Sequence, residues 1–214
     1  MTNVEMMALD TLPEHLVIVG GSYISLEFAQ IYRRFGSRVT VVEMSERIIP
    51  REDEDVSATI REILEGEGIE FQSCSQVSKM ERTDSGFVAH LTQSEGDLEL
   101  SGSHLLMAVG RRPNTDDLGL DKAGVAVDPR GYITVDDQLQ TSVSSIWALG
   151  DCNGQGAFTH TSYNDFEIVA ANLLDNDPRR VSDRIMCYGL FTDPPLGRVG
   201  MTEQQARESG REVL

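Results

Sequence analysis

Residues 15–43 read HLVIVGGSYISLEFAQIYRRFGSRVTVVE, and this stretch decides the fold. It opens on an apolar run, residues 16–19, that stops at Gly20 and Gly21. Such runs are typical of parallel strands, because both faces are covered and no polar alternation is needed. The following residues predict an amphipathic helix that ends at Gly36, because apolar side chains recur at helical spacing, namely Ile24, Phe28, Ile31 and Phe35.

A second strand, residues 38–43, is rich in β-branched side chains and ends in the carboxylate of Glu43. Strand, glycine turn, helix, strand and terminal acid follow the order of the βαβ dinucleotide-binding unit. A pyrophosphate needs N–H donors at a helix N-terminus with no side chain in the way, and Gly20 allows the tight turn that leads there. An acid about 20 residues beyond the turn accepts the hydroxyls of an adenosine ribose and repels a 2′-phosphate. The stretch therefore predicts an NAD(H) site, with NADP(H) disfavoured.

The glycine fingerprint departs from its usual form, because Ser22 and Ser25 stand where its second and third glycines are expected after Gly20. Ser25 is small enough for close packing of the helix on the strand. Ser22 is the larger departure, because the backbone approaches the phosphates there. Either its hydroxyl donates to a phosphate oxygen, or its Cβ weakens binding. A βαβ unit that binds no ligand is the alternative.

Composition narrows the class of protein. The chain has 214 residues, 40% of them hydrophobic and 25% charged, which is an ordinary soluble composition for one large domain or two modest ones. The net charge of −17 argues against nucleic acid and anionic membranes as partners, since both attract basic surfaces. No apolar run approaches the ~20 residues of a membrane span, and residues 1–11 lack the basic start of a signal peptide. We expect a cytoplasmic protein.

The cysteines do not indicate a redox or metal centre. Cys74, Cys152 and Cys187 are widely spaced, odd in number and without a paired C-x-x-C spacing. We expect three inert thiols in a reducing compartment. The sequence predicts no metal ligand and no catalytic residue in this chain.

The remainder of the chain first continues the α/β pattern and then changes. Apolar periodicity predicts a second helix over residues 53–66, and a third strand over residues 69–72 follows it. Alternating segments then predict an antiparallel meander, and the apolar residues 105–109 predict a return to the parallel sheet. The segments expected for the meander and beyond are strands over 77–82, 87–92, 98–101, 125–127, 132–135 and 186–191, a helix over 162–174, and a helix from Thr202 with a capping box.

Four landmarks now stand in order along the chain. They are GGSYISLE at 20–27, VGRRPN at 109–114, IWALGD at 146–151, and FTDPP at 191–195 with VGMTE at 199–203. Together they resemble the FAD-dependent pyridine nucleotide-disulfide oxidoreductases, which include dihydrolipoamide dehydrogenase, glutathione reductase and mercuric reductase. The resemblance is closest to the mercuric-reductase-like and dihydrolipoamide-dehydrogenase-like branch.

The resemblance implies a domain plan. Residues 1–13 are a linker, 14–112 an NAD(P)-binding domain, 113–180 the returning segment of an FAD-binding domain, and 181–214 the start of a dimerisation domain. The fold class is α/β: a Rossmann-like domain with a parallel sheet and an antiparallel meander, plus part of a second α/β domain. The first FAD fingerprint and the redox cysteine pair are missing from the chain. We therefore expect an internal fragment that binds nucleotide, lacks flavin colour and does not turn over.

The resemblance also implies roles for single residues. Tyr23 lies over the flavin where nicotinamide enters, and Glu27 pairs with a lysine from the missing half. Gly110 lies near the nicotinamide ribose, and Asp151 bonds the ribityl chain of FAD. The adenosine edge rests near Arg47, for which solvated surface is the alternative. The full cofactor-binding set that we predict is Gly20, Gly21, Ser22, Tyr23, Ile24, Glu27, Glu43, Met44, Arg47, Val77, Val109, Gly110, Gly150, Asp151, Ala157, Phe158 and Thr159.

The implied activity of the parent protein is hydride transfer from NAD(P)H to FAD and on to a disulfide or metal-ion substrate. A non-catalytic NAD-binding or interaction module is one alternative, and an NADH oxidase-like flavoprotein is another. FAD binding is expected only together with the missing N-terminal half.

Self-association is expected from the second half of the chain. In the family, residues 113–214 pack against segments that are missing here, so apolar side chains lack cover and the strand at 186–191 is left unpaired. We therefore expect a homo-oligomer. The aromatic residues concerned are Trp147, Phe158, Phe166, Tyr188 and Phe191.

Overall fold

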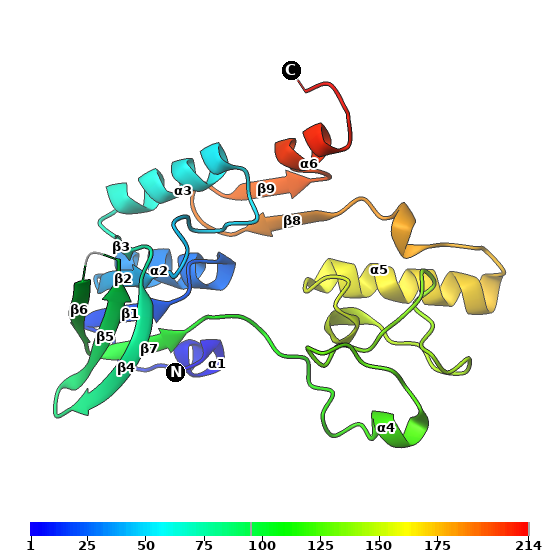
Figure 1. Ribbon diagram of the computed structural model, residues 1–214, viewed down its shortest axis with the longest axis horizontal. Helices are drawn as coiled ribbons and strands as arrows, with labels where there is room; N and C mark the ends of the chain where they lie inside the picture. The colour runs from blue at the N-terminus through cyan, green and yellow to red at the C-terminus, as the bar shows by residue number, and fades with distance from the viewer. Residues whose placement is uncertain (95, 214) are drawn as a thin grey trace. The chain divides into compact units, whose positions relative to one another are not determined.

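The computed structural model describes residues 1–94 and 96–213 (Figure 1). The chain divides into two compact units. The first unit contains Met1–Gly110 together with the residues from Gly189 onward, and the second is Arg111–Tyr188. In the described ranges, no helix is both long and apolar enough to cross a membrane.

A four-stranded parallel sheet forms the centre of the first unit. Its strands are β1 (His15–Val19), β2 (Arg38–Val42), β3 (Glu70–Gln72) and β7 (His104–Met107), in the order β3-β2-β1-β7. Helix α2 (Tyr23–Phe35) connects β1 to β2, and α3 (Glu54–Gly66) connects β2 to β3. The predicted βαβ unit is confirmed, with α2 ending at Gly36 in the left-handed conformation.

Helices α2 and α3 cover one face of this sheet, and an antiparallel meander covers the opposite face. It consists of β4 (Gln76–Thr83), β5 (Gly86–Gln93) and β6 (Gly96–Gly102), as predicted. Successive strand residues point to opposite faces. Accordingly Leu16 and Ile18 of β1 join the main core with α2 and α3, whereas Val17 packs with Ala89 and Leu91 of the meander. Cover on both faces explains why residues 16–19 of β1 are all apolar.

The first residues of the chain are more ordered than a linker. Helix α1 (Asn3–Met7) opens with a capping box made by Thr2 and Glu5. Met6 is buried in the main core, and its carbonyl accepts the Tyr32 hydroxyl at 2.9 Å. A five-residue helix is too short to show an apolar stripe, so the sequence pattern did not predict it.

The C-terminal residues form a small sheet and a short helix. Strand β8 (Cys187–Leu190) pairs with β9 (Leu196–Val199), and α6 (Glu203–Glu208) begins with the predicted capping box of Thr202 and Gln205. The prediction of an unpaired strand at 186–191 was wrong. Its partner β9 contains a glycine and an arginine and has no apolar run that would have marked it.

The second unit has little regular sheet. Its elements are α4 (Leu120–Ala123), the 3₁₀ turn η1 (Gly150–Asn153), α5 (Thr159–Ala170), the π-helical η2 (Ala171–Asp175) and the 3₁₀ turn η3 (Val181–Asp183). The strands predicted at 125–127 and 132–135 are reduced to isolated bridges, one between Val127 and Ile133 and one between Val135 and Thr141. The helix predicted over 162–174 begins earlier, at Thr159, and its last turn is π-helical.

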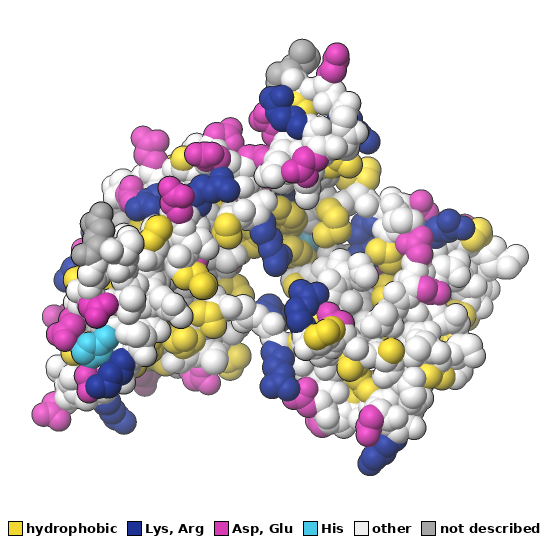
Figure 2. Space-filling model, viewed as in Figure 1, with side chains coloured by type: hydrophobic (Ala, Val, Ile, Leu, Met, Phe, Trp, Pro, Cys, Tyr) yellow, Lys and Arg dark blue, Asp and Glu magenta, His cyan; other side chains and the backbone are white. Residues whose placement is uncertain are grey.

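The surface of the chain mixes both signs of charge. Acidic and basic side chains are interspersed over the face in Figure 2, although the net charge is −17.

Of the five aromatic residues expected to lack cover, Phe166 and Phe191 are exposed, and Trp147, Phe158 and Tyr188 are half-buried.

Candidate dinucleotide-binding site

The glycine turn lies where three parallel strands end. Gly20 has a φ of 107°, and its N–H donates to the carbonyl of Val42 at 2.8 Å. A Cβ on Gly20 would lie 2.5 Å from the carbonyl oxygen of Ala108, which follows β7. Only glycine fits at this position. Ligands of open parallel sheets bind at this edge, beyond the carboxyl ends of the strands.

Glu43 is fixed beside the turn by two backbone amides. Its Oε2 accepts the N–H of Gly21 at 2.6 Å, and its Oε1 accepts the N–H of Ser45 at 2.8 Å. A Cβ on Gly21 would lie 2.9 Å from the same Oε2. The carboxylate therefore keeps one position, and each oxygen retains a lone pair for a further hydroxyl donor.

The two serines of the fingerprint have different surroundings. Ser25 is fully buried, and its hydroxyl donates to the Gly20 carbonyl, so helix and strand pack closely there. Ser22 is the exposed N-cap of α2, and its hydroxyl caps no amide of the helix. Its φ of −107° is one that any residue adopts, so this position does not require glycine.

The first turns of α2 place Tyr23, Ile24 and Glu27 near this edge. Tyr23 and Ile24 are half-buried, and the Tyr23 hydroxyl donates to Oε1 of Glu52 at 2.5 Å. Oε1 of Glu27 accepts the N–H of Phe191 at 2.9 Å. One oxygen of the carboxylate that we expected to pair with a lysine thus holds the C-terminal segment.

The remaining predicted contacts of the first unit are spread around the sheet edge. Met44 and Val109 are 72% and 68% exposed, and Gly110 has a φ of 131° with open space where a Cβ would lie. Arg47 lines a cavity of about 470 Å³ whose other walls are mostly acidic. Val77 lies in β4 and packs against a buried cluster of Val17, Val42, Ala89 and Leu91, in which Val42 is the residue before Glu43.

The predicted flavin-side residues lie in the second unit. Gly150 is buried, and Asp151 forms an ion pair with Arg111 at 3.2 Å. Phe158 stacks on His160 and on Tyr188, with ring centroids 5.4 and 5.7 Å apart. Ala157 and Thr159, on either side of Phe158, are exposed.

Comparison with known proteins decides the family. The family model described as pyridine nucleotide-disulphide oxidoreductase matches residues 1–165. The chain belongs to this family. The family resemblance predicted from the four landmarks is confirmed.

Individual relatives of the family align along almost the whole chain. A probable pyridine nucleotide-disulfide oxidoreductase, RclA of Escherichia coli, is 40% identical over 97% of this chain and 46% of its own length. A mercuric reductase of Streptomyces lividans is 40% identical over 98% of the chain and 44% of its own length. Dihydrolipoyl dehydrogenase 3 of Haloarcula marismortui is 36% identical over 94% of the chain and 43% of its own length. The chain thus spans less than half the length of these curated relatives.

Solved structures of the family share the fold. A Cu(II) complex of the HOCl-induced flavoprotein disulfide reductase RclA from Escherichia coli matches with a TM-score of 0.91 and 38% identity, over 99% of this chain and 48% of that one. LpdA from Mycobacterium tuberculosis matches with a TM-score of 0.88 and 28% identity, over 98% of this chain and 45% of the LpdA chain.

Within this family member, α2 contacts the C-terminal segment through residues that the sequence analysis missed. Gln30 accepts the N–H of Asp193 at 2.8 Å and donates to its carbonyl at 3.0 Å. Arg34 forms ion pairs with Asp193 and Glu67, at 2.9 and 2.6 Å. Together with Glu27, they lie on one side of α2. Their spacing of three and four residues was the sequence signal that could have predicted a polar contact surface on this helix.

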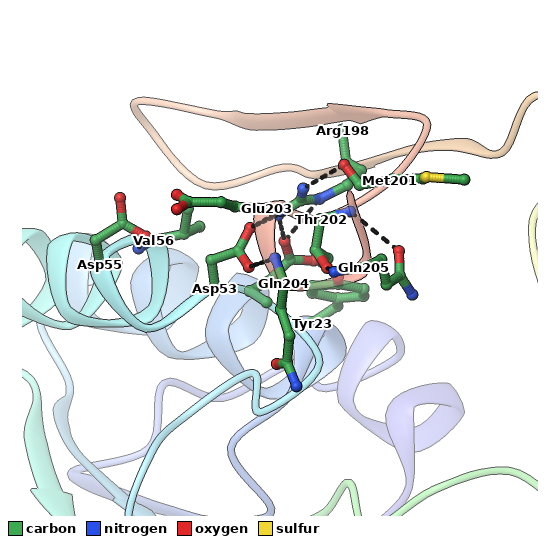
Figure 3. Close-up of polar contacts among 11 residues, drawn as sticks. Tyr23, Asp53, Asp55, Val56, Arg198, Met201, Thr202, Glu203, Gln204 and Gln205 are labelled. Atoms are coloured by element: carbon green, nitrogen blue, oxygen red, sulfur yellow. Dashed lines mark hydrogen bonds and ion pairs between the residues drawn. The ribbon is translucent and has the colours of Figure 1, made fainter. Parts of the chain in front are cut away.

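The loop before α3 holds α6 in the same way. Figure 3 shows the Asp53 carboxylate directed at the backbone of Glu203 and Gln204, whose amides donate at 2.9 and 3.2 Å. The Glu203 amide is the main cause that lowers the pKa of Asp53 below its ordinary value, and Arg198 contributes. A carboxylate at a helix N-terminus also interacts favourably with the helix dipole.

Docking of α6 is expected to weaken at low pH. The folded-state pKa of Asp53 lies below its unfolded value, so its contribution is complete above the unfolded value and is lost as pH falls through the folded-state value. We expect hydrogen exchange in α6, corrected for the intrinsic pH dependence, to lose protection as pH drops below about 4. Asp53→Asn should show weaker protection at pH 7 and a smaller pH dependence. Equal pH profiles of α6 in both proteins would contradict the assignment.

The cysteines are separate in the structure. Cys74, Cys152 and Cys187 are free thiols, and burial raises the pKa of the Cys152 thiol. Among the described residues, no group of three or more His, Cys, Asp or Glu side chains is arranged to hold a metal ion.

Proposed function

We propose that this chain is the NAD(H)-binding portion of a flavin-dependent oxidoreductase that passes hydride from NAD(P)H to flavin and on to a disulfide or metal-ion substrate. The observation that supports it most is the Glu43 carboxylate, fixed by the Gly21 and Ser45 amides beside a glycine turn at the edge of a parallel sheet. The similarity to a mercuric reductase and to a flavoprotein disulfide reductase supports the two substrate classes.

The residues of the first unit fit a dinucleotide. Gly20 and Gly21 leave no side chain between the turn and a pyrophosphate at the start of α2, and the helix N-terminus supplies N–H donors. Glu43 receives the ribose hydroxyls of the adenosine half. Gly110 lets the backbone approach from β7, since nothing lies within 4 Å of the place where its Cβ would be. The bound nicotinamide supplies the hydride, and the protein orients it and excludes water.

The domain plan is part of the proposal. Residues 14–112 form the NAD(P)-binding domain, 113–180 the returning FAD segment, and 181–214 the start of a dimerisation domain, after the short segment 1–13. The two compact units divide between Gly110 and Arg111, and this division supports the proposed end of the NAD(P)-binding domain near residue 112. In the proposal, Asp151, Phe158 and their neighbours contact FAD once the rest of its site is present, and the parent is a cytoplasmic homo-oligomer.

The chain is expected to bind NADH at least about fivefold more tightly than NADPH. A 2′-phosphate brought within ~4 Å of the Glu43 carboxylate is repelled by about 1–4 kcal/mol, and 1.4 kcal/mol corresponds to tenfold in affinity. Titration calorimetry with both nucleotides measures the ratio. Glu43→Gln keeps the shape and removes the charge, so it should bring the two affinities closer together.

Arg47 provides the control for this preference. If its guanidinium reaches the 2′-phosphate, Arg47→Gln will weaken NADPH binding selectively. Equal or tighter binding of NADPH by the unmodified chain would refute the assignment of NAD(H), and absence of binding of either nucleotide would refute the dinucleotide site.

A further inference from the structure

Tyr23 follows Ser22 after the glycine turn, and both its ring and its hydroxyl have defined contacts. Its ring packs against the main core cluster, and its hydroxyl donates to Oε1 of Glu52 at 2.5 Å. Tyr23 is the first residue of α2. A dinucleotide whose pyrophosphate lies on the amides of this helix therefore passes directly beside it.

Glu52 is a buried carboxylate that is paired with the guanidinium of Arg198. Its side chain is 0% exposed, and its Oε2 accepts Nε of Arg198 at 2.9 Å and also Nη2. Arg198 lies in β9 and is 12% exposed, and its Nη1 donates to the Met201 carbonyl at 3.3 Å. Hydrogen bonds within an ion pair are stronger than neutral ones, so the pairing with Arg198 makes the Glu52 carboxylate a strong and fixed acceptor for the Tyr23 hydroxyl.

We propose that Glu52 and Arg198 are positioning residues that hold the Tyr23 ring in place for the nicotinamide half of the dinucleotide. This inference rests on the proposed function. Glu43 receives the adenosine half, so the half that meets Tyr23 is the nicotinamide half. The C-terminal segment, through Arg198, thereby determines how well the first unit binds a complete dinucleotide.

The test compares NADH with ADP-ribose, which has the adenosine and pyrophosphate groups but no nicotinamide. Both are titrated into the full chain, into Arg198→Gln, Arg198→Lys and Tyr23→Phe, and into the double variant Arg198→Gln/Tyr23→Phe. We expect Arg198→Gln and Tyr23→Phe each to weaken NADH binding about tenfold, as expected when a hydrogen bond to a charged group is lost. ADP-ribose affinity should stay unchanged, and Arg198→Lys should recover much of the NADH affinity.

The double variant separates positioning from general support of the fold. If Arg198 acts through the Tyr23 hydroxyl, adding Arg198→Gln to Tyr23→Phe causes no further loss of NADH affinity. Arg207→Gln is the matched control: Arg207 lies in the same segment, pairs with Glu203 on the surface of α6, and should leave both affinities unchanged.

Several results would overturn the inference. Additive losses in the double variant, or equal losses for NADH and ADP-ribose, would show that Arg198 supports only the fold. If Arg198→Gln does not fold, Tyr23→Phe decides, because unchanged NADH affinity in that variant refutes the role of the hydroxyl. An unmodified chain that binds neither ligand overturns the proposed function as well, whereas binding by the unmodified chain with unaffected variants overturns this inference alone.

Discussion

Replacing Gly20 by alanine is expected to lower the free energy of unfolding by about 3 kcal/mol or more. The new Cβ would lie 2.5 Å from the carbonyl oxygen and 2.9 Å from the carbonyl carbon of Ala108. Neither atom belongs to a side chain that can rotate away, so the ends of β1 and β7 would have to separate. The positive φ of 107° adds a conformational cost of about 1–3 kcal/mol. Urea denaturation followed by circular dichroism measures the change.

Gly36 offers a control with the same backbone conformation. Its φ is 108°, but a Cβ there would meet only Leu12 Cδ2 at 4.0 Å. Gly36→Ala therefore bears the conformational cost of about 1–3 kcal/mol without the clash. The difference between the two variants isolates the close approach of the turn to β7. If both variants lose the same stability, the steric explanation for Gly20 fails.

Replacing Asp165 by asparagine is expected to destabilise the second unit by about 3–5 kcal/mol. Asp165 is fully buried and accepts the Gly150 amide and the Asn153 side chain, each at 2.8 Å. It also forms an ion pair with Arg184, whose side chain is only 9% exposed. Asparagine has nearly the same shape but removes the charge, and the guanidinium is then buried without an anion.

Trp147 makes this measurement specific. It is the only tryptophan of the chain and lies in the second unit, so its fluorescence during urea denaturation reports on that unit. Asp177→Asn is the matched control, because Asp177 and Arg179 pair at 2.9 Å with both side chains 52% exposed. A pair so exposed contributes about 0–1 kcal/mol. A loss below about 1 kcal/mol in Asp165→Asn would contradict the buried-pair interpretation.

The sequence by itself determined the elements whose pattern is local. Residues 15–43 contain strand, glycine turn, amphipathic helix and second strand in immediate succession, and each has its own periodicity or punctuation. The meander and the capping box at Thr202 were predicted for the same reason. The landmarks that show the family also consist of short contiguous motifs. Gly20 and Glu43 belonged to the predicted site because their spacing is part of such a motif.

Tertiary structure decided what depends on residues far apart in the chain. Nothing around Arg198 indicates that it pairs with Glu52, and nothing around Asp165 indicates that it pairs with Arg184. The short helix α1 and the pairing of β8 with β9 are also stabilised by partners that no local pattern reveals. The physical reason is that burial, and with it the need for a counter-charge or a strand partner, is a property of the assembled core. An isolated acid or arginine has the same sequence signature on the surface and in the interior, and only the fold distinguishes them.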